Sequence, residues 1–414
     1  MNEIRNLLIG IDFGKVNTQI CCYDRKADEP RSLSVKAGDG SYEIPTNLAK
    51  RPDSPDYMIG VSDRQAEESG ASCVKELYAV SGREDKVRIG DEEKEPWEVT
   101  ALFLKGVLRY LGVADPVKNT SAIAIAAAEL TSARVENLKK ACAELGFAGK
   151  KLILLDYDES FFYYAMTQRK EPVSRSVAWF RFDGNNVEYR KMTLRSDLKP
   201  IRVMMDKPVM TDLPEENEAR DEAFAIFIQK TLGQEMFSSI QITGEGFDQS
   251  VLPRSIRILC FGKRKVYFGN NLYARGACAA AKERTENHDL KNFRFISPSI
   301  INNNVGMEMR IMGSPTYHPL IRSGSNWYEC ESSCELILDG MEELIFEVET
   351  PEEPEKKRVA MKLPGLPSRP PRTTRLLLEM KYISREECRI KVTDLGFGEM
   401  FPASGKVWTE TVRW

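Results

Sequence analysis

Histidine is almost absent from this chain: only His288 and His318 occur among its 414 residues. Neither lies in a recognisable motif, which excludes most nucleophilic and zinc chemistry that depends on histidine. Any chemistry would have to use carboxylates, a bound metal or backbone donors. A dominant charge sign is also absent, since 59 Lys and Arg residues balance 62 Asp and Glu residues, for a formal net charge of −3. We therefore expect no nucleic-acid partner.

Long apolar runs are missing as well. No stretch approaches the roughly 20 residues of a membrane span, and the N-terminus lacks a basic segment followed by an apolar one. We expect no membrane partner and a cytoplasmic location. The nine cysteines agree with that compartment, because their number is odd and Cys142 and Cys278 fall in predicted helices. They are expected to be small core residues rather than disulfide partners.

What is present begins with residues 7–23. An apolar run of strand length ends at Asp12, a turn containing Gly14 follows, and a second apolar run leads away. This predicts a tight hairpin with a carboxylate at its bend. Gly14 lets the backbone approach a ligand, N–H groups in such a turn can cradle phosphate oxygens, and Asp12 could hold the water shell of a magnesium ion. The alternative is an ordinary hairpin with a capping Asp.

Strands and helices alternate in the segment that follows, up to about residue 285. A second strand–turn–strand unit at 177–189 repeats the plan of the first hairpin, with Asp183-Gly184-Asn185-Asn186 as its turn. The other predicted helices are 96–112, 132–146, 160–166, 214–233 and 272–282, and the other predicted strands are 122–126, 151–155 and 239–246. This alternation indicates an α/β domain.

The pattern changes near residue 285. From there Pro and Gly interrupt short alternating runs, and no helical period is evident. This predicts an all-β sandwich of roughly a hundred residues. The predicted strands are 335–338, 343–348, 358–363, 375–382, 389–393 and 407–412.

Taken in this order along the chain, the predicted elements resemble those of the seventy-kilodalton heat-shock chaperone family, the DnaK-like branch of the actin-like ATPase superfamily. Residues 9–18 look like the family's first phosphate-binding hairpin, and 44–46 look like the segment after it. Residues 122–165 are similar to its strand–helix–strand–helix unit. The remaining resembling segments are 242–246 (adenosine contact), 274–277 (second inter-lobe helix) and, in the sandwich, 318–322, 363–372 and 378–393.

The resemblance implies an α/β two-lobed actin-like (ribonuclease H-like) ATPase fold, with lobes at 1–175 and 176–290. An all-β sandwich resembling the chaperone peptide-binding domain is implied at 297–414. The implied cofactor is ATP or ADP with magnesium, held through water on Asp12, and the implied partner is extended polypeptide or one specific protein. The implied nucleotide-binding residues are Asp12, Gly14, Asn17, Thr18, Asp183, Gly184, Gly244, Gly246 and Gly276.

Several positions depart from the family pattern. Arg181 replaces the leading carboxylate of the second phosphate motif, unless a register shift of two residues puts Asp183 there. The motif's triple glycine is lost in both registers, which weakens close backbone approach to phosphate. The family's catalytic Glu falls near Asp158, whose side chain is one methylene shorter. Most of the subdomain that clamps the adenine is expected to be missing, and no helical lid is expected after Trp414.

Some of these residues have plain structural alternatives. Gly244 and Gly246 could only end a strand, and Gly276 could permit two helices to pack closely. The aromatic run at 161–164 is expected in the core rather than on a binding surface. Arg181 could pair with phosphate oxygens, or it could form a salt bridge with Asp12 and fill the cleft.

The departures favour a degenerate chaperone-like protein that keeps both lobes and the sandwich for protein binding, with weak or absent ATP hydrolysis. Phosphoryl transfer depends on positioned donors and charge neutralisation, so losing several phosphate contacts removes much of the required stabilisation. The alternative is an active ATP-dependent molecular chaperone, in which hydrolysis of Mg-ATP is coupled to peptide binding. A sugar kinase-like or filament-forming member of the actin superfamily is disfavoured by the sandwich.

Overall fold

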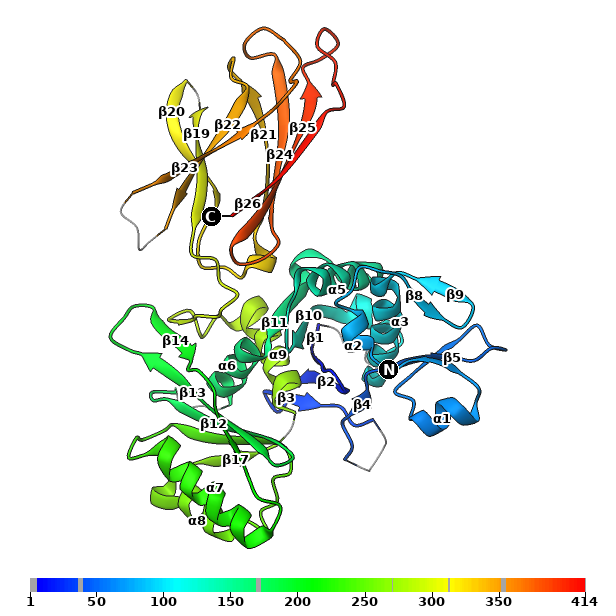
Figure 1. Ribbon diagram of the computed structural model, residues 1–414, viewed down its shortest axis with the longest axis vertical. Coiled ribbons are helices and arrows are strands. Elements are labelled where there is room, and N and C mark those ends of the chain that lie inside the picture. The colour runs from blue at the N-terminus through cyan, green and yellow to red at the C-terminus, as the bar shows by residue number, and fades with distance from the viewer. Residues whose placement is uncertain are drawn as a thin grey trace. The chain divides into compact units, whose positions relative to one another are not determined.

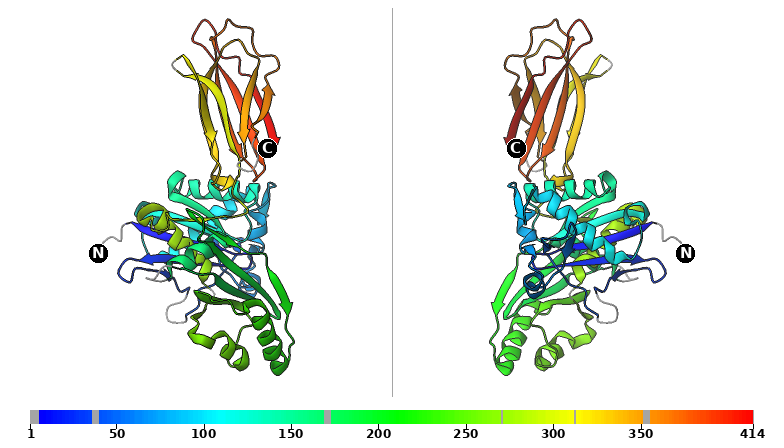
Figure 2. Two further views of the ribbon diagram at one scale, coloured as in Figure 1. Left: turned by 90° about the vertical axis from the view of Figure 1, so that its left-hand side faces the viewer. Right: turned by 90° about the vertical axis from the view of Figure 1, so that its right-hand side faces the viewer.

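The computed structural model describes residues 6–35, 40–168, 173–269, 271–311, 313–350 and 355–413. The chain divides into two compact units, Met1–Ile296 and Ser297–Trp414. The first unit combines sheets and helices, whereas the second consists almost entirely of strands (Figure 1 and Figure 2).

The first unit contains two large sheets. The elements of the first are β1 (Leu7–Phe13), β2 (Asn17–Asp24), β3 (Glu29–Ser32), β4 (Ile44–Pro45), α3 (Pro96–Leu108), β10 (Thr120–Ala127), α5 (Ser132–Glu144), β11 (Leu152–Asp156) and α6 (Tyr157–Thr167). The strand order is β11-β10-β1-β2-β3, and β4 also pairs with β2. β1 to β3 form an antiparallel meander, while β10 and β11 add in parallel beside β1. All of β1 is buried, as expected for a central strand covered on both faces.

The second sheet repeats this plan. Its elements are β12 (Val177–Asp183), β13 (Asn186–Arg195), β14 (Ile201–Met205), β15 (Val209–Asp212), α7 (Asn217–Leu232), β16 (Ser239–Glu245), α8 (Pro253–Leu259), β17 (Val266–Phe268), α9 (Leu272–Lys282) and β18 (Phe293–Phe295). The order is β17-β16-β12-β13-β14-β18, with β12 to β14 as the antiparallel meander and β16 and β17 added in parallel. Because β18 belongs to this sheet, the predicted end of the lobe at residue 290 is too early.

The last helix of each half brings the two sheets together. α9 follows the second sheet but packs against β1 of the first, where a Cβ at Gly10 would overlap the carbonyl oxygen of Ala274. α9 also crosses α6 closely, because Gly276 leaves room for the carbonyl of Ser160. Small residues on α9 thus allow backbone-to-backbone approach on two sides.

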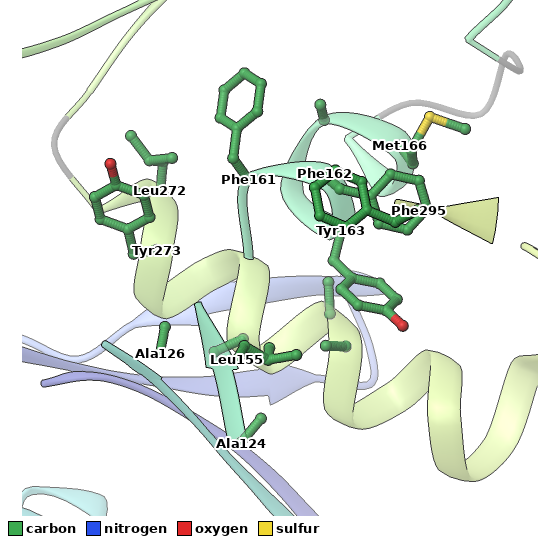
Figure 3. Packing of buried hydrophobic residues seen from close by; sticks show 14 of the residues in the cluster. Ala124, Ala126, Leu155, Phe161, Phe162, Tyr163, Met166, Leu272, Tyr273 and Phe295 are labelled. Carbon is green, nitrogen blue, oxygen red and sulfur yellow. The ribbon is translucent and has the colours of Figure 1, made fainter. Parts of the chain in front are cut away.

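Aromatic side chains of α6 continue this core toward the second sheet. Phe161 stacks on Trp179 of β12, with ring centroids 4.9 Å apart. Figure 3 shows Phe162 beside Phe295 of β18, and their centroids are 5.2 Å apart. One apolar cluster therefore includes residues from both sheets and from both helices.

Smaller elements lie outside these two sheets. A three-stranded sheet of order β6-β5-β7 and a β8–β9 hairpin lie between β4 and α3 in the sequence. The elements are β5 (Leu48–Lys50), β6 (Tyr57–Ile59), α1 (Asp63–Glu68), β7 (Ser72–Val74), α2 (Leu77–Val80), β8 (Val87–Ile89), β9 (Glu92–Lys94) and, before β10, α4 (Pro116–Asn119).

The second unit, here called the sandwich, has two four-stranded antiparallel sheets. Its strands are β19 (Asn304–Ile311), β20 (Ser314–Ile321), β21 (Glu331–Leu338), β22 (Glu343–Glu349), β23 (Lys357–Lys362), β24 (Thr374–Tyr382), β25 (Glu387–Gly396) and β26 (Val407–Arg413). The orders are β20-β19-β22-β23 and β21-β24-β25-β26. On β24, Leu376, Leu378 and Met380 are at most 2% exposed, which is the period-two burial of a strand with one covered face.

The predicted elements are largely confirmed. The helix predicted at 272–282 coincides with α9, and the six strands predicted from residue 335 onward correspond to β21 to β26. β19, β20 and the small sheets were not predicted, and the helix predicted from residue 160 begins earlier, at Tyr157. None of the helices in the described part of the chain has the length and apolar character that crossing a membrane would require.

Candidate functional site

Asp12 lies near the end of β1, where the first hairpin turns. It is 7% exposed and stands opposite Gln19 of β2. The hydroxyl of Tyr157 donates a 2.7 Å hydrogen bond to its Oδ1. Burial raises the pKa of Asp12 to about 7; the bond from Tyr157 lowers it and the charge of Glu43 raises it further. A carboxyl group with this pKa is partly protonated at neutral pH, which opposes binding of a divalent cation.

Tyr157 is the first residue of α6 and directly follows β11. Its ring stacks on Tyr273 of α9, with centroids 3.6 Å apart and planes 10° apart. Trp179 meets Tyr273 edge to face, at 6.0 Å. Burial raises the pKa of Tyr157, so its hydroxyl stays protonated and can donate to Asp12. Aromatic side chains from α6, α9 and β12 therefore gather on one side of this carboxyl group.

Asp158, the predicted catalytic residue, has a different partner. Its carboxylate accepts two hydrogen bonds from the guanidinium of Arg190, of which the Nη2–Oδ2 bond is 2.8 Å long. Both side chains are less than 20% exposed. A carboxylate held in such a bidentate pair is poorly placed to accept a proton as a general base. The residue of this segment that reaches Asp12 is Tyr157, one position earlier.

The first hairpin uses its other predicted residues for internal contacts. A Cβ at Gly14 would overlap the carbonyl oxygen of Asn17, so the tight turn requires glycine. Asn17 donates to Glu43 at 3.2 Å, and the hydroxyls of Thr18 and Thr46 are 2.8 Å apart. Thr18 is completely buried. These side chains fix the segment around β4 against β2.

The tip of the second hairpin is held by Arg220 of α7, which is 6% exposed. Its guanidinium donates to the carbonyl oxygens of Gly184 and Gly246, at 2.7 and 3.0 Å, and to Asn185 Oδ1 at 2.6 Å. The N–H of Gly184 donates to the carbonyl oxygen of Glu245 at 3.0 Å. The tip therefore directs carbonyl oxygens toward a cation, whereas a phosphate cradle needs N–H groups.

Arg181 and Asp183 precede that tip on β12. Arg181 hydrogen-bonds Glu188 on the neighbouring strand, so of its two suggested roles the structure does not show the salt bridge with Asp12. Asp183 is exposed at the end of the strand. At neither of these two positions does the second hairpin have a buried carboxyl group like that of Asp12 in the first hairpin.

The predicted glycines have packing roles. A Cβ at Gly244 would overlap the carbonyl oxygen of Phe182, and one at Gly276 would overlap that of Ser160. Gly244 and Gly246 have φ angles of 95° and 100°, where side chains are strained. Close backbone approach therefore accounts for these glycines without a ligand.

Two buried polar atoms of the site have no hydrogen-bond partner among the described residues: Gln19 Oε1 and the hydroxyl of Tyr273. Their residues are 5% and 9% exposed. Gln19 lies on the same sheet face as Asp12, because directly opposed residues of an antiparallel pair share a face.

Sequence reasoning missed the residues that define this chemistry. Tyr157 had a usable signal, since it directly follows a predicted strand and so lies at the strand's carboxyl end. Arg220 and Gln19 had no such signal in the sequence. Arg220 reaches the second hairpin from a helix, and Gln19 lies opposite Asp12 only because of the register between two strands. The structure brings Asp12 together with Tyr157, which stacks on Tyr273. Asp158 instead pairs with Arg190, and the tip of the second hairpin is bonded by Arg220.

These residues do not fit a magnesium nucleotide. Magnesium in nucleotide sites is usually held by one or two ionised carboxylates, substrate phosphates and waters, whereas Asp12 is buried, has a raised pKa and is bonded to Tyr157. Asp158 is neutralised by Arg190, and the second hairpin presents carbonyl oxygens. Among the described residues, no group of three or more His, Cys, Asp or Glu side chains could hold a metal ion.

Comparison with known proteins gives two matches to families. Residues 29–298 match the model of the C-terminal part of a family of unknown function (DUF5716), and residues 300–414 match a domain of unknown function (DUF8552). The two matches meet at the division between the two compact units. No curated protein matches the chain. Because the first match covers more than half of its length, the chain belongs to the family of unknown function DUF5716.

Proposed function

We propose that this chain is a chaperone-like protein with two actin-like lobes and a degenerate nucleotide site. It binds polypeptide, or one protein partner, through its sandwich, and it hydrolyses ATP weakly or not at all. The hydrogen bond from Tyr157 to Asp12 carries this proposal, because it occupies the carboxyl group that the resemblance assigns to magnesium.

The bond from Tyr157 opposes the binding of a magnesium nucleotide at Asp12. A hydrogen bond to a charged group contributes roughly 1.5–3 kcal/mol. A magnesium nucleotide that displaced Tyr157 would lose about ten- to a hundredfold in affinity from this exchange alone. It would also have to ionise a carboxyl group whose pKa is about 7 and open the stack between Tyr157 and Tyr273.

The repeated sheets support the two-lobed part of the proposal. Each half runs through a three-stranded meander, a helix, a parallel strand, a helix, a second parallel strand and a helix. Such a repeat is what two actin-like lobes require. The two four-stranded antiparallel sheets of the sandwich support a chaperone-like peptide-binding module, since exposed edge strands can add an extended peptide.

The proposed degeneration of the nucleotide site is tested by calorimetric titration of the full chain with Mg-ATP and with Mg-ADP, together with a phosphate-release assay. We expect no measurable heat at micromolar protein and release at background level. Tyr157→Phe should still give background release, but it should raise the affinity for Mg-ATP by up to about ten- to a hundredfold, because no bond to Asp12 has to be displaced. Tyr164→Phe, in the same helix, removes a hydroxyl bonded to Gln168 and serves as the matched control.

The active chaperone is the alternative outcome. Magnesium-dependent phosphate release by the wild type, abolished in Asp12→Asn with the fold intact by circular dichroism, would overturn the degenerate reading. It would mean that the nucleotide supplies enough binding energy to displace Tyr157.

A further inference from the structure

The amino ends of three parallel strands of the second sheet lie together at one edge of the first unit. β16 lies between β12 and β17, and all three strands run in the same direction. The N–H of Ser238 donates to the carbonyl oxygen of Ser176, and the N–H of Ile240 donates to that of Lys265, both at 2.9 Å. The segments that lead into these strands therefore meet at this edge, and they are 174–176, 230–238 and 257–265.

These three segments are strongly basic, although the whole chain is not. They contain one acidic residue, Glu235, and six Lys or Arg residues, whereas the chain has 59 Lys and Arg against 62 Asp and Glu. Glu235 already pairs with Lys191 at 3.1 Å. A local excess of positive charge indicates an anionic partner. The six basic residues are Arg175, Lys230, Arg257, Lys263, Arg264 and Lys265.

Two of the six cations have an ordinary explanation in the helices. Lys230 and Arg257 lie in the last turns of α7 and α8, where the helix dipole stabilises a positive charge. Arg175 and Arg264 lie outside helices, and neither forms an ion pair with any residue that the structure describes. Arg175 instead contacts the sulfur of Met236 through Nη1, at 3.4 Å. The guanidinium groups of Arg175 and Arg264 can therefore pair with a ligand.

Two large apolar side chains are exposed between these charges. Met236 is 63% exposed and Phe261 is 75% exposed, and neither belongs to the apolar clusters of the unit. A single exposed apolar residue is normal on a protein surface. Here, however, each lies close to a cation, since Met236 contacts Arg175 and Phe261 precedes Arg264 by three residues. The surface thus combines apolar side chains with unpaired positive charge.

The corresponding end of the first sheet lacks this combination. There the segments 109–119 and 145–151 lead into β10 and β11, and Lys150 and Lys151 directly precede β11. None of the large apolar side chains described in these two segments is exposed. Positive charge before the outer parallel strand is therefore common to both sheets, whereas the exposed apolar side chains are particular to the second.

We propose that this surface, defined by Arg175, Met236, Phe261, Arg264 and Lys265, binds a short segment of a partner protein in which acidic and large apolar side chains alternate. Carboxylates of the segment would pair with the two guanidinium groups. Its apolar side chains would cover the phenylalanine and the methionine, whose flexible side chain adapts to different partners. The proposal goes beyond the proposed function, which assigns polypeptide binding to the sandwich, and it does not rest on that function.

An extended polyanion is a poorer occupant of this surface than a short segment. Outside the three basic segments the chain is more acidic than the whole, whose formal net charge is −3. A nucleic acid or a leaflet of anionic lipid would extend beyond the surface and meet this opposing charge. A segment of about six residues spans about 20 Å, and it interacts mainly with charges within a Debye length, about 8 Å at physiological ionic strength.

The test uses the full chain and fluorescence anisotropy at low ionic strength with two labelled peptides of ten residues. One peptide alternates glutamate with leucine, and the other alternates lysine with leucine. We expect the glutamate peptide to bind at least tenfold more tightly than the lysine peptide. Arg264→Glu should weaken binding of the glutamate peptide about threefold to tenfold through charge repulsion. Phe261→Ser keeps every charge and should weaken it at least threefold.

Two variants are matched controls. Lys150→Glu makes a similar change of charge before the outer parallel strand of the first sheet. Met210→Ser removes an apolar side chain that is 59% exposed on β15, outside the proposed surface. Both should bind the glutamate peptide like the wild type. Because Phe261 and Met210 are exposed, the serine variants lose no core contact, and circular dichroism should show the wild-type fold.

Three results would overturn the proposal. Equal weakening by Arg264→Glu and Lys150→Glu would mean that the peptide responds only to overall charge. Binding that neither Arg264→Glu nor Phe261→Ser weakens would move the peptide to another surface, including the sandwich, and would leave the proposed function standing. Absence of binding by the glutamate peptide would reject the surface as a peptide site, and binding of phosphatidylserine vesicles in that case would make anionic lipid the occupant.

Discussion

The two hairpins of the first unit hold the same place in repeated sheets, but the charged group lies in the hairpin at the first and in the covering helix at the second. At the first, a buried carboxyl group on Asp12 is met by a donor from α6, the hydroxyl of Tyr157. At the second, carbonyl oxygens of the tip are met by a buried cation from α7, the guanidinium of Arg220. Repetition of the sheet thus determines where a hairpin lies, whereas a helical side chain determines which donor its oxygen atoms meet.

The largest expected effect concerns the second hairpin. Arg220→Met removes the hydrogen bonds that a buried guanidinium donates to three carbonyl oxygens, of Gly184, Pro214 and Gly246, and to one side-chain amide oxygen. A hydrogen bond to a charged group contributes about 1.5–3 kcal/mol, but water can reach the freed acceptors because their residues are exposed, so we expect a total loss of about 3 kcal/mol in the free energy of unfolding. Urea denaturation followed by circular dichroism measures this loss.

The matched control is Arg254→Met. Arg254 is exposed and forms a 3.3 Å ion pair with Glu222, which should contribute no more than about 0.5 kcal/mol. A similar loss in both variants would show that Arg220 does not hold the hairpin.

The next effect is a pH dependence at the first hairpin. Burial raises the pKa of Asp12 from 3.8 to about 7, so the folded state keeps a proton that the unfolded chain has lost. Its contribution to stability is complete below pH 3.8 and is lost as the pH rises toward about 7. Between pH 5 and pH 8 this loss should be about 2 kcal/mol. Asp12→Asn should remove it, so the variant should gain stability relative to the wild type as the pH rises.

Asp183→Asn provides the comparison at the second hairpin. Asp183 is exposed, so this variant controls for the loss of a hairpin carboxylate that is not buried. The measurement is thermal unfolding of the three proteins at pH 5, 6, 7 and 8. A constant difference between the wild type and Asp12→Asn across this range would contradict the prediction.

The sequence predicted the elements better than it predicted the contacts between them. Periodicity located α9 and the strands of the sandwich, because burial of one face repeats locally. It placed the start of α6 at residue 160, whereas Asp156 caps the helix and Tyr157 begins it. That shift decides which side chain faces Asp12, and a helix boundary is the least predictable feature of a helix. The candidate role of Asp158 came from the family resemblance, which does not show that the side chain pairs with Arg190.

Long-range polar contacts could not be predicted at all. Arg220 reaches a hairpin tip that lies 36 residues away in the sequence, and Tyr157 is 145 residues from Asp12. No local pattern records which carbonyl oxygen a helical guanidinium will meet. The strands β19 and β20 were missed for a different reason, since two prolines break the alternating pattern of β20.

A smaller effect tests the bond at the first hairpin directly. Tyr157→Phe keeps the stack on Tyr273 but removes the 2.7 Å bond to Asp12, so we expect about 1 kcal/mol less stability at pH 8. At pH 5 the loss should be smaller, because a neutral carboxyl group is a weaker acceptor. Thermal unfolding at the two pH values measures the difference, and equal losses at both would contradict an ionisable acceptor.

The smallest effect is expected for Arg181→Ala, the position where the family pattern has a carboxylate. Arg181 is 45% exposed, and its partner Glu188 retains Arg190 at 4.0 Å, so removing Arg181 should cost no more than about 0.5 kcal/mol. Arg190→Ala should cost clearly more, because it leaves the half-buried carboxylate of Asp158 without its bidentate partner. Urea denaturation of both variants gives the contrast. A loss for Arg181→Ala as large as that for Arg190→Ala would mean that the second hairpin, like the first, depends on a charge at its own strand and not only on the cation supplied by α7.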